Sequence, residues 1–226
     1  MSNSTLKIDL HIHTCVSKDG ALHPAEVIRI AKQKGLDRIC ITDHNSIEGA
    51  LEAHRLDPEF VMVGEEIKTT YGELLAFFVR EWVPPRLSPE ETLQRLRDQG
   101  AVISVSHPFD QHRPHWSPEL LAALVPQLDA VEALNARTLN PEYNEKAKAF
   151  AANYGLWTTA GSDAHSGLEI GAAYVEMPIF QTAAEFRAAL KQAIIGGQVS
   201  PAWVHLFSRF NTWRGKLGLK PVLSKP

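Results

Sequence analysis

The stretch LKIDLHIHTCVSKDGALHPAEVIRIAKQKGLDRICITDH, residues 6–44, decides the fold. It opens with an apolar, β-branched run over 6–13, which is typical of a strand. After a loop comes an amphipathic run over 24–35, with proline in its first turn and glycine at its end, which predicts a helix. A second apolar run follows at 38–42. Strand, helix and strand in this order form the repeating unit of a parallel sheet.

The same alternation continues along the rest of the chain. Further strands are predicted at 60–69, 73–79, 101–107, 128–134, 156–163 and 172–177. Helices are predicted to begin near Ser46 and to span 88–100, 117–125, 140–155 and 182–197. The strands at 60–69 and 73–79 are close enough to form a hairpin through Tyr71 and Gly72. The pattern predicts one α/β domain in which helices cover a largely parallel sheet, either a barrel or a doubly wound sheet.

Composition and charge narrow the classes of function. The chain has 226 residues, of which 44% are hydrophobic and 22% charged, so disorder and coiled coil are excluded. A net charge of -3 argues against a stable complex with nucleic acid. No apolar stretch approaches the ~20 residues that cross a bilayer, so no membrane partner is expected. Two cysteines and a first segment without the apolar core of a signal peptide predict a cytoplasmic protein.

Histidines and carboxylates gather at the predicted strand ends. These residues are His11, His13, His44, His107 and His165, with Asp19, Asp43, Glu65, Glu66, Glu73 and Asp163. In parallel α/β folds the carboxyl ends of the strands line the functional face. Imidazole suits zinc, manganese and iron, and a carboxylate can bridge two ions. So many donors exceed one tetrahedral site, and the sequence predicts two or three divalent ions that could act on a phosphate ester.

The segments DLHIHTCVSKDG, ITDHNSIEGA, GEEIKTTYGELLAFF, SVSHPFD and AGSDAHSGLEIG resemble the successive motifs of the polymerase-and-histidinol-phosphatase (PHP) domain family. The order, spacing and residue types agree, and the resemblance covers about residues 6–195. It implies a distorted, TIM-like (β/α)7 barrel as a single domain over 1–200, with a trinuclear metal site. Residues 201–226 are expected to form a helical extension packed on the barrel.

The resemblance also implies a ligand set. His11, His13, Glu66 and Asp163 would hold the first ion; His107 and Glu73, with Glu66 as the bridge, the second; and Asp19, His44 and His165 the third. Many relatives have a histidine where this chain has Glu73, so the second site departs from the common pattern. Glu65 is given no ligand role. The implied cofactors are two to three divalent ions, Mn²⁺, Fe²⁺ or Zn²⁺.

Other residues are expected to support the reaction. Asp43 can orient a neighbouring imidazole. Arg113 and Arg137 are predicted to bind the substrate phosphate, because the guanidinium fork matches it. His165 is expected to protonate the leaving oxygen, and Asp163 and Glu66 complete the predicted catalytic set.

The resulting hypothesis is a metal-dependent phosphoesterase that attacks its substrate with metal-bound hydroxide. The expected substrate is a small phosphorylated metabolite, foremost a nucleotide, a nucleoside bisphosphate or an oligoribonucleotide end. Three alternatives stay open: a phosphomonoesterase of the histidinol-phosphatase type, a non-catalytic metal-bound domain with a regulatory or assembly role, and hydrolysis at carbon as in amidohydrolase-type barrels. The last alternative requires a bridging lysine at a central strand end, and none is evident.

Overall fold

A single sheet of nine strands runs through the part of the chain that the structure, a computed structural model, describes, residues 5–223. The strands are β1 (Thr5–Ile12), β2 (Arg38–Ile41), β3 (Val61–Lys68), β4 (Glu73–Phe77), β5 (Val102–Val105), β6 (Ala130–Asn135), β7 (Trp157–Gly161), β8 (Ala173–Pro178) and β9 (Ile194–Gly197). Their order in the sheet is β7-β6-β5-β4-β3-β2-β1-β8-β9.

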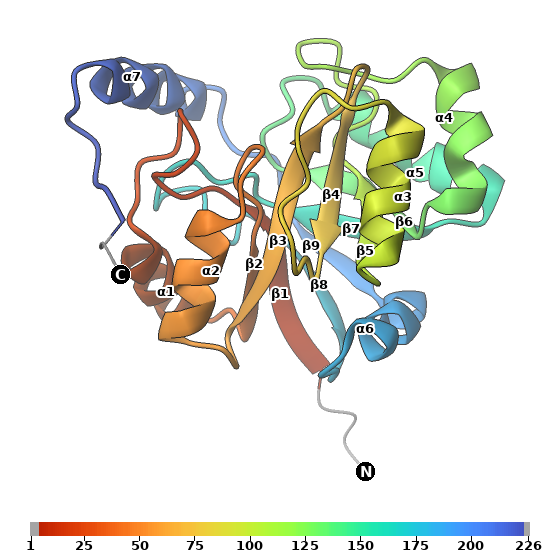
Figure 1. The fold of residues 1–226 in the computed structure, drawn as a ribbon, viewed down its shortest axis with the longest axis horizontal. Coiled ribbons are helices and arrows are strands. Elements are labelled where there is room, and N and C mark those ends of the chain that lie inside the picture. The colour runs from red at the N-terminus through yellow and green to blue at the C-terminus, as the bar shows by residue number, and fades with distance from the viewer. Residues whose placement is uncertain (1–4, 224–226) are drawn as a thin grey trace.

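The sheet curls into a nearly closed barrel. Strands β1, β2 and β3 are parallel to one another, as are β5, β6 and β7, whereas β4 runs antiparallel to both of its neighbours. Strands β1 and β8 also lie against β7, which brings the two halves of the sheet together. The expected TIM-like α/β fold in one domain is therefore confirmed. Among β1–β7, β4 is the one strand that runs in the reverse direction. In Figure 1 β1 rises from the end at which the chain enters, β3 also runs upward, and the arrow of β4 points downward.

The predicted hairpin accounts for the reversed direction of β4. A short turn joins β3 to β4, in which the Thr69 amide and hydroxyl both donate to the Gly72 carbonyl, at 3.0 and 2.8 Å. A Cβ at Gly72 would lie 2.2 Å from the Trp116 indole nitrogen, so this position requires glycine. Because the turn is so short, Glu73 begins β4 at the same end of the barrel at which β3 finishes.

Helices cover the outside of the barrel. They are α1 (Pro24–Gln33), α2 (Glu48–Leu56), α3 (Pro89–Asp98), α4 (Pro118–Leu124), α5 (Pro141–Tyr154), α6 (Ala183–Ala189) and α7 (Val204–Lys216), with 3₁₀ turns η1 (Val125–Gln127) and η2 (Leu190–Gln192). Side-chain caps fix several starts, as where Ser88 accepts from the Glu91 amide and Ser117 from the Leu120 amide. None of the helices within residues 5–223 is long and apolar enough to cross a membrane.

One predicted helix is wrong in part. The sequence predicts a single helix over 182–197, but α6 ends at Ala189 and the chain then forms η2 and β9. The β-branched pair Ile194-Ile195 followed by Gly196-Gly197 disfavours helix, and this segment instead pairs antiparallel with β8 at the edge of the sheet. The reason is local propensity at the end of an otherwise helical pattern.

An irregularity in β1 decides which side chains enter the barrel. Ile8 and Leu10 pack in the inner hydrophobic cluster, whereas Ile12 packs in the outer cluster under α1 and α2. The register of the β1–β2 pairing shifts between Asp9 and Ile12, as at a β-bulge. The shift inverts the alternation, so that His11 and the following His13 point to the interior at the carboxyl end of the barrel.

Candidate metal centre

Nine residues that the sequence predicts as ligands meet at the carboxyl end of the barrel. They come from β1 or its end (His11, His13), the following loop (Asp19), the end of β2 (His44), the β3–β4 hairpin (Glu66, Glu73), the end of β5 (His107) and the end of β7 (Asp163, His165). All are buried except Asp19 and His44, whose side chains are about one-fifth exposed. Six segments of the chain thus bring polar side chains to one place.

The first group joins the two histidines of β1 to Asp163. The Nε2 atoms of His11 and His13 are 3.0 Å apart, and the His13 nitrogen is 3.2 Å from Asp163 Oδ1. Both nitrogens also face Glu66 Oε2, at 3.4 and 3.5 Å. Two ring nitrogens and two carboxylate oxygens therefore surround one small volume.

The second group is formed by two carboxylates and one imidazole. His107 Nε2 lies 3.0 Å from Glu66 Oε1 and 3.7 Å from Glu73 Oε2. Burial and the neighbouring charge of Glu66 raise the pKa of Glu73. A cation between the two carboxylates would remove that repulsion, so Glu73 lies where a ligand of the second ion is expected.

The third group lies nearest to solvent. His44 Nε2 and His165 Nε2 lie 3.6 and 3.4 Å from Asp19 Oδ1. The ring of His13 is between them, with centroid distances of 4.3 Å to each. His44 Nδ1 lies 2.8 Å from Glu66 Oε2, so this carboxylate borders all three groups.

Hydrogen bonds behind the rings set which nitrogen faces the cluster. His11 Nδ1 lies 2.8 Å from Glu132 Oε1, which can only accept while it is ionised, and His165 Nδ1 lies 2.8 Å from the Asp163 carbonyl. His13 Nδ1 lies 3.1 Å from Ser17 Oγ, whose own proton goes to Asp43. These nitrogens carry a hydrogen, so each Nε2 is the atom that a cation would bind, displacing a second ring proton where one is held, as on His11.

Asp43 supports the cluster from behind, as an orienting residue. It accepts from the amide and hydroxyl of Thr14, at 2.7 and 2.6 Å, and from the amide and hydroxyl of Ser17, at 3.2 and 2.6 Å. Ser17 Oγ in turn accepts from the His44 amide. Asp43 therefore acts on His13 and His44 through Ser17 rather than by direct contact.

Buried oxygens without partners show that these residues fit divalent cations. Within residues 5–223, Asp19 Oδ1, Glu66 Oε2 and Asp163 Oδ1 are buried and accept no hydrogen bond. Three imidazole nitrogens lie 2.8–3.5 Å from Glu66 Oε2, yet none is placed to donate to it. Buried polar atoms are rarely left unsatisfied, and oxygens gathered beside ring nitrogens are the donor set of divalent metals.

The charge states agree with cation binding. Burial by itself raises the pKa of Asp163, but the charges of Arg113 and His11 outweigh it and hold that pKa well below its usual range. Glu66 behaves likewise, because the charges of His11 and His44 outweigh its burial. Burial and the charges of His165 and His44 lower the pKa of His13 well below its usual value, so its ring is neutral and able to coordinate at neutral pH.

Two of these residues have strained backbone. His107 and Asp163 have positive φ angles of 23° and 53°, in a region that residues other than glycine seldom adopt. Each follows the end of a barrel strand, where the backbone must turn away while the side chain stays directed inward. Strain of this kind is concentrated at functional sites.

The two predicted phosphate-binding arginines border the cluster and are already engaged. Arg113 donates to Asp163 Oδ2 and lies 3.5 Å from Asp110. Arg137 donates to Glu169 at 2.6 Å and to Ser208 of α7 at 2.8 Å, while its buried Nε has no partner among the described residues. Both arginines line a cavity of about 600 Å³ together with His44, His165, Asp19, Glu73, His112 and His205.

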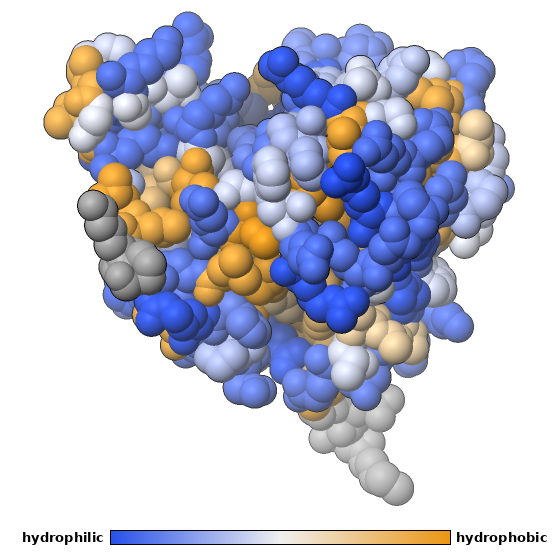
Figure 2. All heavy atoms as spheres, viewed as in Figure 1, coloured by the Kyte–Doolittle hydropathy of each residue, from blue (hydrophilic) through white to orange (hydrophobic). Residues whose placement is uncertain are grey.

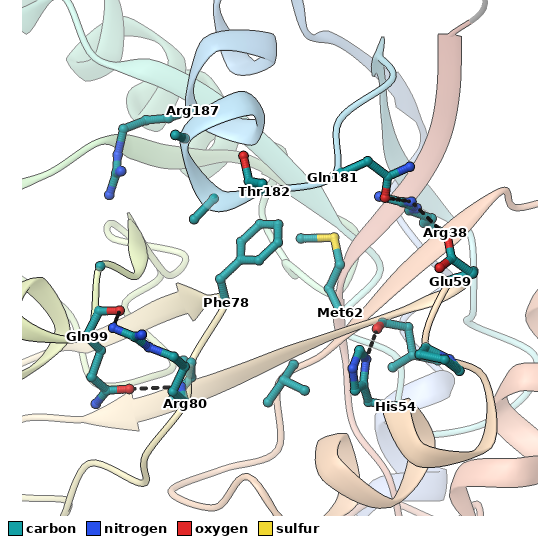
Figure 3. A pocket seen from close by; sticks show the side chains of 17 residues that line it. Arg38, His54, Glu59, Met62, Phe78, Arg80, Gln99, Gln181, Thr182 and Arg187 are labelled. Carbon is teal, nitrogen blue, oxygen red and sulfur yellow. Dashed lines mark hydrogen bonds and ion pairs between the residues drawn. The ribbon is translucent and has the colours of Figure 1, made fainter.

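A larger cavity lies at the other end of the barrel. It measures about 780 Å³ and is lined by the first residues of β2 and β3, by the chain after β4 and by the start of α6. Figure 3 shows Phe78 and Met62 directed into it and Arg38, Arg80 and Arg187 around it. No histidine or carboxylate of the predicted set lines it, so volume alone does not locate the metal site.

Sequence reasoning missed several supporting residues. Glu132 contacts His11 and accepts from the His107 amide at 2.9 Å, and Ser106 donates to Glu66 at 2.7 Å. Glu169 holds Arg137, and His205 reaches the cavity from α7. The one signal in the sequence was Glu132 itself, a charged residue within the apolar strand AVEAL.

Comparisons with known proteins agree with this geometry. The sequence model of the PHP domain matches residues 9–76, and that of the PHP-associated region matches residues 141–193. Uncharacterized protein MJ1587 of Methanocaldococcus jannaschii is 36% identical over 144 residues, which are 58% of this chain and 82% of that protein. The probable phosphatase YcdX of Escherichia coli O127:H6 is 26% identical over 197 residues, covering 73% and 80% of the two chains.

A solved structure shows the same fold. It is a two-domain protein from Bacteroides vulgatus that contains a predicted PHP-like metal-dependent phosphoesterase. The superposition has a TM-score of 0.70 at 18% identity and covers 92% of this chain and 70% of that one. Taken with the matched sequence models and the gathered ligand set, these likenesses show that the chain belongs to the PHP family of metal-dependent hydrolases.

Proposed function

We propose that this PHP-type, metal-dependent phosphoesterase hydrolyses a small phosphorylated metabolite, with a nucleotide, a nucleoside bisphosphate or an oligoribonucleotide end as the substrate class. The observation that carries the proposal is the set of unsatisfied carboxylate oxygens next to an open cavity bordered by two arginines. The phosphatase name of YcdX supports a phosphate ester as substrate.

Three groups of side chains would hold the ions. His11, His13 and Asp163 form one, Glu73 and His107 another, and His44, His165 and Asp19 the third, with Glu66 next to all three. When bound, divalent ions supply positive charge for the phosphate oxygens and make water a better nucleophile at neutral pH. Metal of this kind gives a locally positive site to a protein whose net charge is -3.

Arg113 is proposed to exchange partners during binding. Its guanidinium rests on Asp163, the carboxylate that a cation would take over. Once that carboxylate is neutralised, the guanidinium is free to turn toward the cavity and donate to a pair of phosphate oxygens. Arg137 is proposed to contact the same phosphate from the other side of the cavity, with Glu169 and Ser208 fixing its plane.

His165 is proposed to deliver the proton to the leaving oxygen while its Nε2 is protonated. Because one Nε2 cannot hold a proton and an ion at once, the third ion would then rest on His44 and Asp19. It lines the cavity beside Arg137, and the carbonyl of Asp163 fixes its Nδ1. Its Nε2 therefore faces both Asp19 and the open volume in which the leaving group would lie. A ring held in one orientation at the mouth of the cavity meets the geometric requirement for a general acid.

A phosphate-release screen tests the proposal. The protein, supplied with manganese, iron(II) or zinc, is assayed on nucleotides, nucleoside bisphosphates, short oligoribonucleotides and sugar phosphates. Release is expected to be fastest for the nucleotide group and to vanish in Glu66→Ala. The matched control is Glu65→Gln. The Glu65 side chain lies on the opposite face of β3 from Glu66 and accepts a hydrogen bond from the Val83 amide. No release from any ester with any of the three metals would contradict the proposed function, and release confined to sugar phosphates would contradict the substrate class.

A further inference from the structure

Helix α7 has one face that belongs to the barrel. Val204, Ser208 and Asn211 are buried on this face. Ser208 accepts from Arg137, and the Asn211 amide donates to the carbonyl of Asp19 at 3.2 Å. These contacts place α7 at the carboxyl end of the barrel, where the proposed metal ligands lie, and Figure 1 shows the helix at one end of the barrel.

The opposite face of α7 is apolar and faces solvent. Six side chains form it and are between 39% and 64% exposed: Trp203, Leu206, Phe207, Phe210, Trp213 and Leu217. With about 3.6 residues per turn, they fall within roughly one third of the helix circumference, opposite the buried face. We call this surface the aromatic stripe. In Figure 2 hydrophobic residues show at the outer edge of the molecule where α7 lies.

Basic residues lie beside and within the aromatic stripe. The helical period places Arg209 and Lys216 along one edge and Arg214 among the side chains of the stripe, between Trp203 and Phe207. The sequence from 201 to 226 contains no aspartate or glutamate, whereas residues 1–200 hold all 26 acidic residues and 18 of the 23 basic ones, a net charge of -8. Positive charge is therefore concentrated around this one apolar surface.

We propose that the aromatic stripe docks the protein on an anionic membrane surface. A helix with Trp, Phe and Leu on one face and Arg and Lys beside them lies in the plane of the headgroups and inserts its apolar face. The exposed Leu219 and Val222, just after the helix, extend the same apolar surface. The proposal departs from the expectation of no membrane partner. That expectation rested on the lack of a spanning segment, which a helix lying on the membrane surface does not require.

The acidic body of the protein would favour one orientation. A net charge of -8 on residues 1–200 is repelled by anionic lipid, while the basic side chains of α7 are attracted. The protein would therefore meet the membrane with α7 foremost. Because His205 of α7 also lines the 600 Å³ cavity, the mouth of that cavity would lie next to the docked surface.

Two other occupants fit the observations less well. A second copy paired through the same stripe would set Arg209, Arg214 and Lys216 against themselves in a two-fold interface, where like charges repel. Single-stranded nucleic acid would need flat rings on which bases can stack. The ring pairs of the stripe are instead inclined to each other, by 72° for Trp203 and Phe207 and by 31° for Phe210 and Trp213. Three leucines and a valine in the same surface offer no stacking at all.

Co-sedimentation with vesicles tests the proposal on the full, metal-loaded chain. Vesicles of phosphatidylcholine alone are compared with vesicles that also contain phosphatidylglycerol, at low and high salt. We expect binding to the anionic vesicles that weakens with salt. The double variant Phe210→Ser/Trp213→Ser should lower the partition coefficient roughly a hundredfold, since each ring contributes about tenfold or more. Arg209→Glu/Lys216→Glu should weaken binding to anionic vesicles by roughly fivefold or more per residue.

The control is Ile179→Ser, which removes a side chain of similar exposure, 53%, just beyond β8 at the amino end of the barrel. It should bind vesicles as the wild type does, and all variants should keep wild-type turnover of a small soluble ester. Several outcomes would overturn the proposal: equal binding to neutral and anionic vesicles, no vesicle binding, salt-dependent binding of a homopolymeric oligonucleotide that displaces the vesicles, or self-association in solution that Phe210→Ser/Trp213→Ser abolishes.

Discussion

The two ends of the barrel are both rich in charged side chains, but these side chains differ in how completely they are hydrogen-bonded. At the amino end, around the 780 Å³ cavity, Arg38 donates to the Phe180 carbonyl and to Gln181, and Arg187 donates to Asp129 and to the Ala101 carbonyl. His54 likewise reaches the Val61 carbonyl at 2.7 Å, and Figure 3 shows several of these pairs. Each charged or polar group there has a partner.

At the carboxyl end, the crowded carboxylates keep oxygens that accept nothing. Folding gathers Asp19, Glu66 and Asp163 at considerable desolvation cost and then leaves one oxygen of each unsatisfied. Neither the size of a cavity nor its charge therefore identifies a site, because arginines that line a cavity can be fully engaged in hydrogen bonds within the protein. A lone unsatisfied atom such as Glu65 Oε1 marks nothing, but several unsatisfied carboxylate oxygens gathered beside ring nitrogens identify the end that awaits a ligand.

The largest effect is expected for Glu66→Ala. It removes the carboxylate that borders all three groups, so activity should fall by roughly a thousandfold or more, since electrophilic stabilisation by metal amounts to several kcal/mol. Metal analysis should show lower bound metal in parallel. Wild-type turnover in this variant would mean that the unsatisfied oxygens do not mark the active end.

Its neighbour Glu65 gives the contrasting case of a buried carboxyl kept neutral. Burial raises the pKa of Glu65 to about 8, above its value in the unfolded chain. The proton that Glu65 holds in the folded state therefore stabilises the protein at low pH, and this contribution is lost as pH rises from about 5 to beyond 8, up to several kcal/mol. Glu65→Gln should flatten that decline in urea unfolding followed against pH. An equally steep decline in the variant would assign the effect to another group.

Removal of metal should lower the stability of the protein, and a change at the amino end of the barrel should not alter this effect. At a free metal concentration about a hundredfold above its dissociation constant, bound metal should add roughly 3 kcal/mol to the free energy of unfolding. A chelator should therefore lower Tm in the wild type and in Arg187→Ala alike, because Arg187 lies at the other end. A Tm that does not respond to manganese, iron or zinc would remove the basis for a metal centre.

Arg187→Ala tests the amino end directly. The change removes donors to Asp129 and to the Ala101 carbonyl, which should cost about 1–3 kcal/mol of stability. Turnover at saturating metal should be unchanged, since Arg187 is far from the cluster along the barrel. A loss of activity at unchanged stability would show that the amino-end cavity takes part in the reaction.

The smallest expected effect is at Glu73, where this chain departs from the common family pattern. As a ligand beside Glu66 and a single imidazole, Glu73 makes the second group oxygen-rich, which favours manganese or iron(II) relative to a site with more imidazole. Glu73→His should shift the ratio of activities toward zinc by about tenfold or less. Metal content and preference unchanged in Glu73→Ala would show that this carboxylate does not ligate.

Much of this arrangement follows from the sequence because it is local. The β3–β4 hairpin was predicted from the spacing of two apolar runs around Tyr71 and Gly72, and the strand ends that carry His44, His107 and Asp163 from short apolar segments. Family resemblance then grouped these residues, and the structure brings the same residues together. Their roles as ligands stay predictions that the variants above would test.

What could not be predicted depends on contacts between distant segments. Glu132 supports His11 from a strand 121 positions later, and no motif marks it. Arg137 was expected to be free for substrate, but Glu169 and Ser208 already hold it, from segments 32 and 71 residues away. Nor does the sequence show which way His11 points, because the answer depends on a register shift between β1 and β2.

The register shift in β1 also limits how the sequence of this strand can change in length. Ile8 and Leu10 fill the interior toward the amino end of the barrel with hydrocarbon. After the register shift the same strand directs His11 and His13 into the interior at the carboxyl end. One strand thereby packs hydrocarbon at the amino end of the barrel and carries two of the proposed ligands at the carboxyl end. An insertion or deletion of one residue in this strand would exchange the two roles, so length is a stricter constraint on β1 than the identity of most of its side chains.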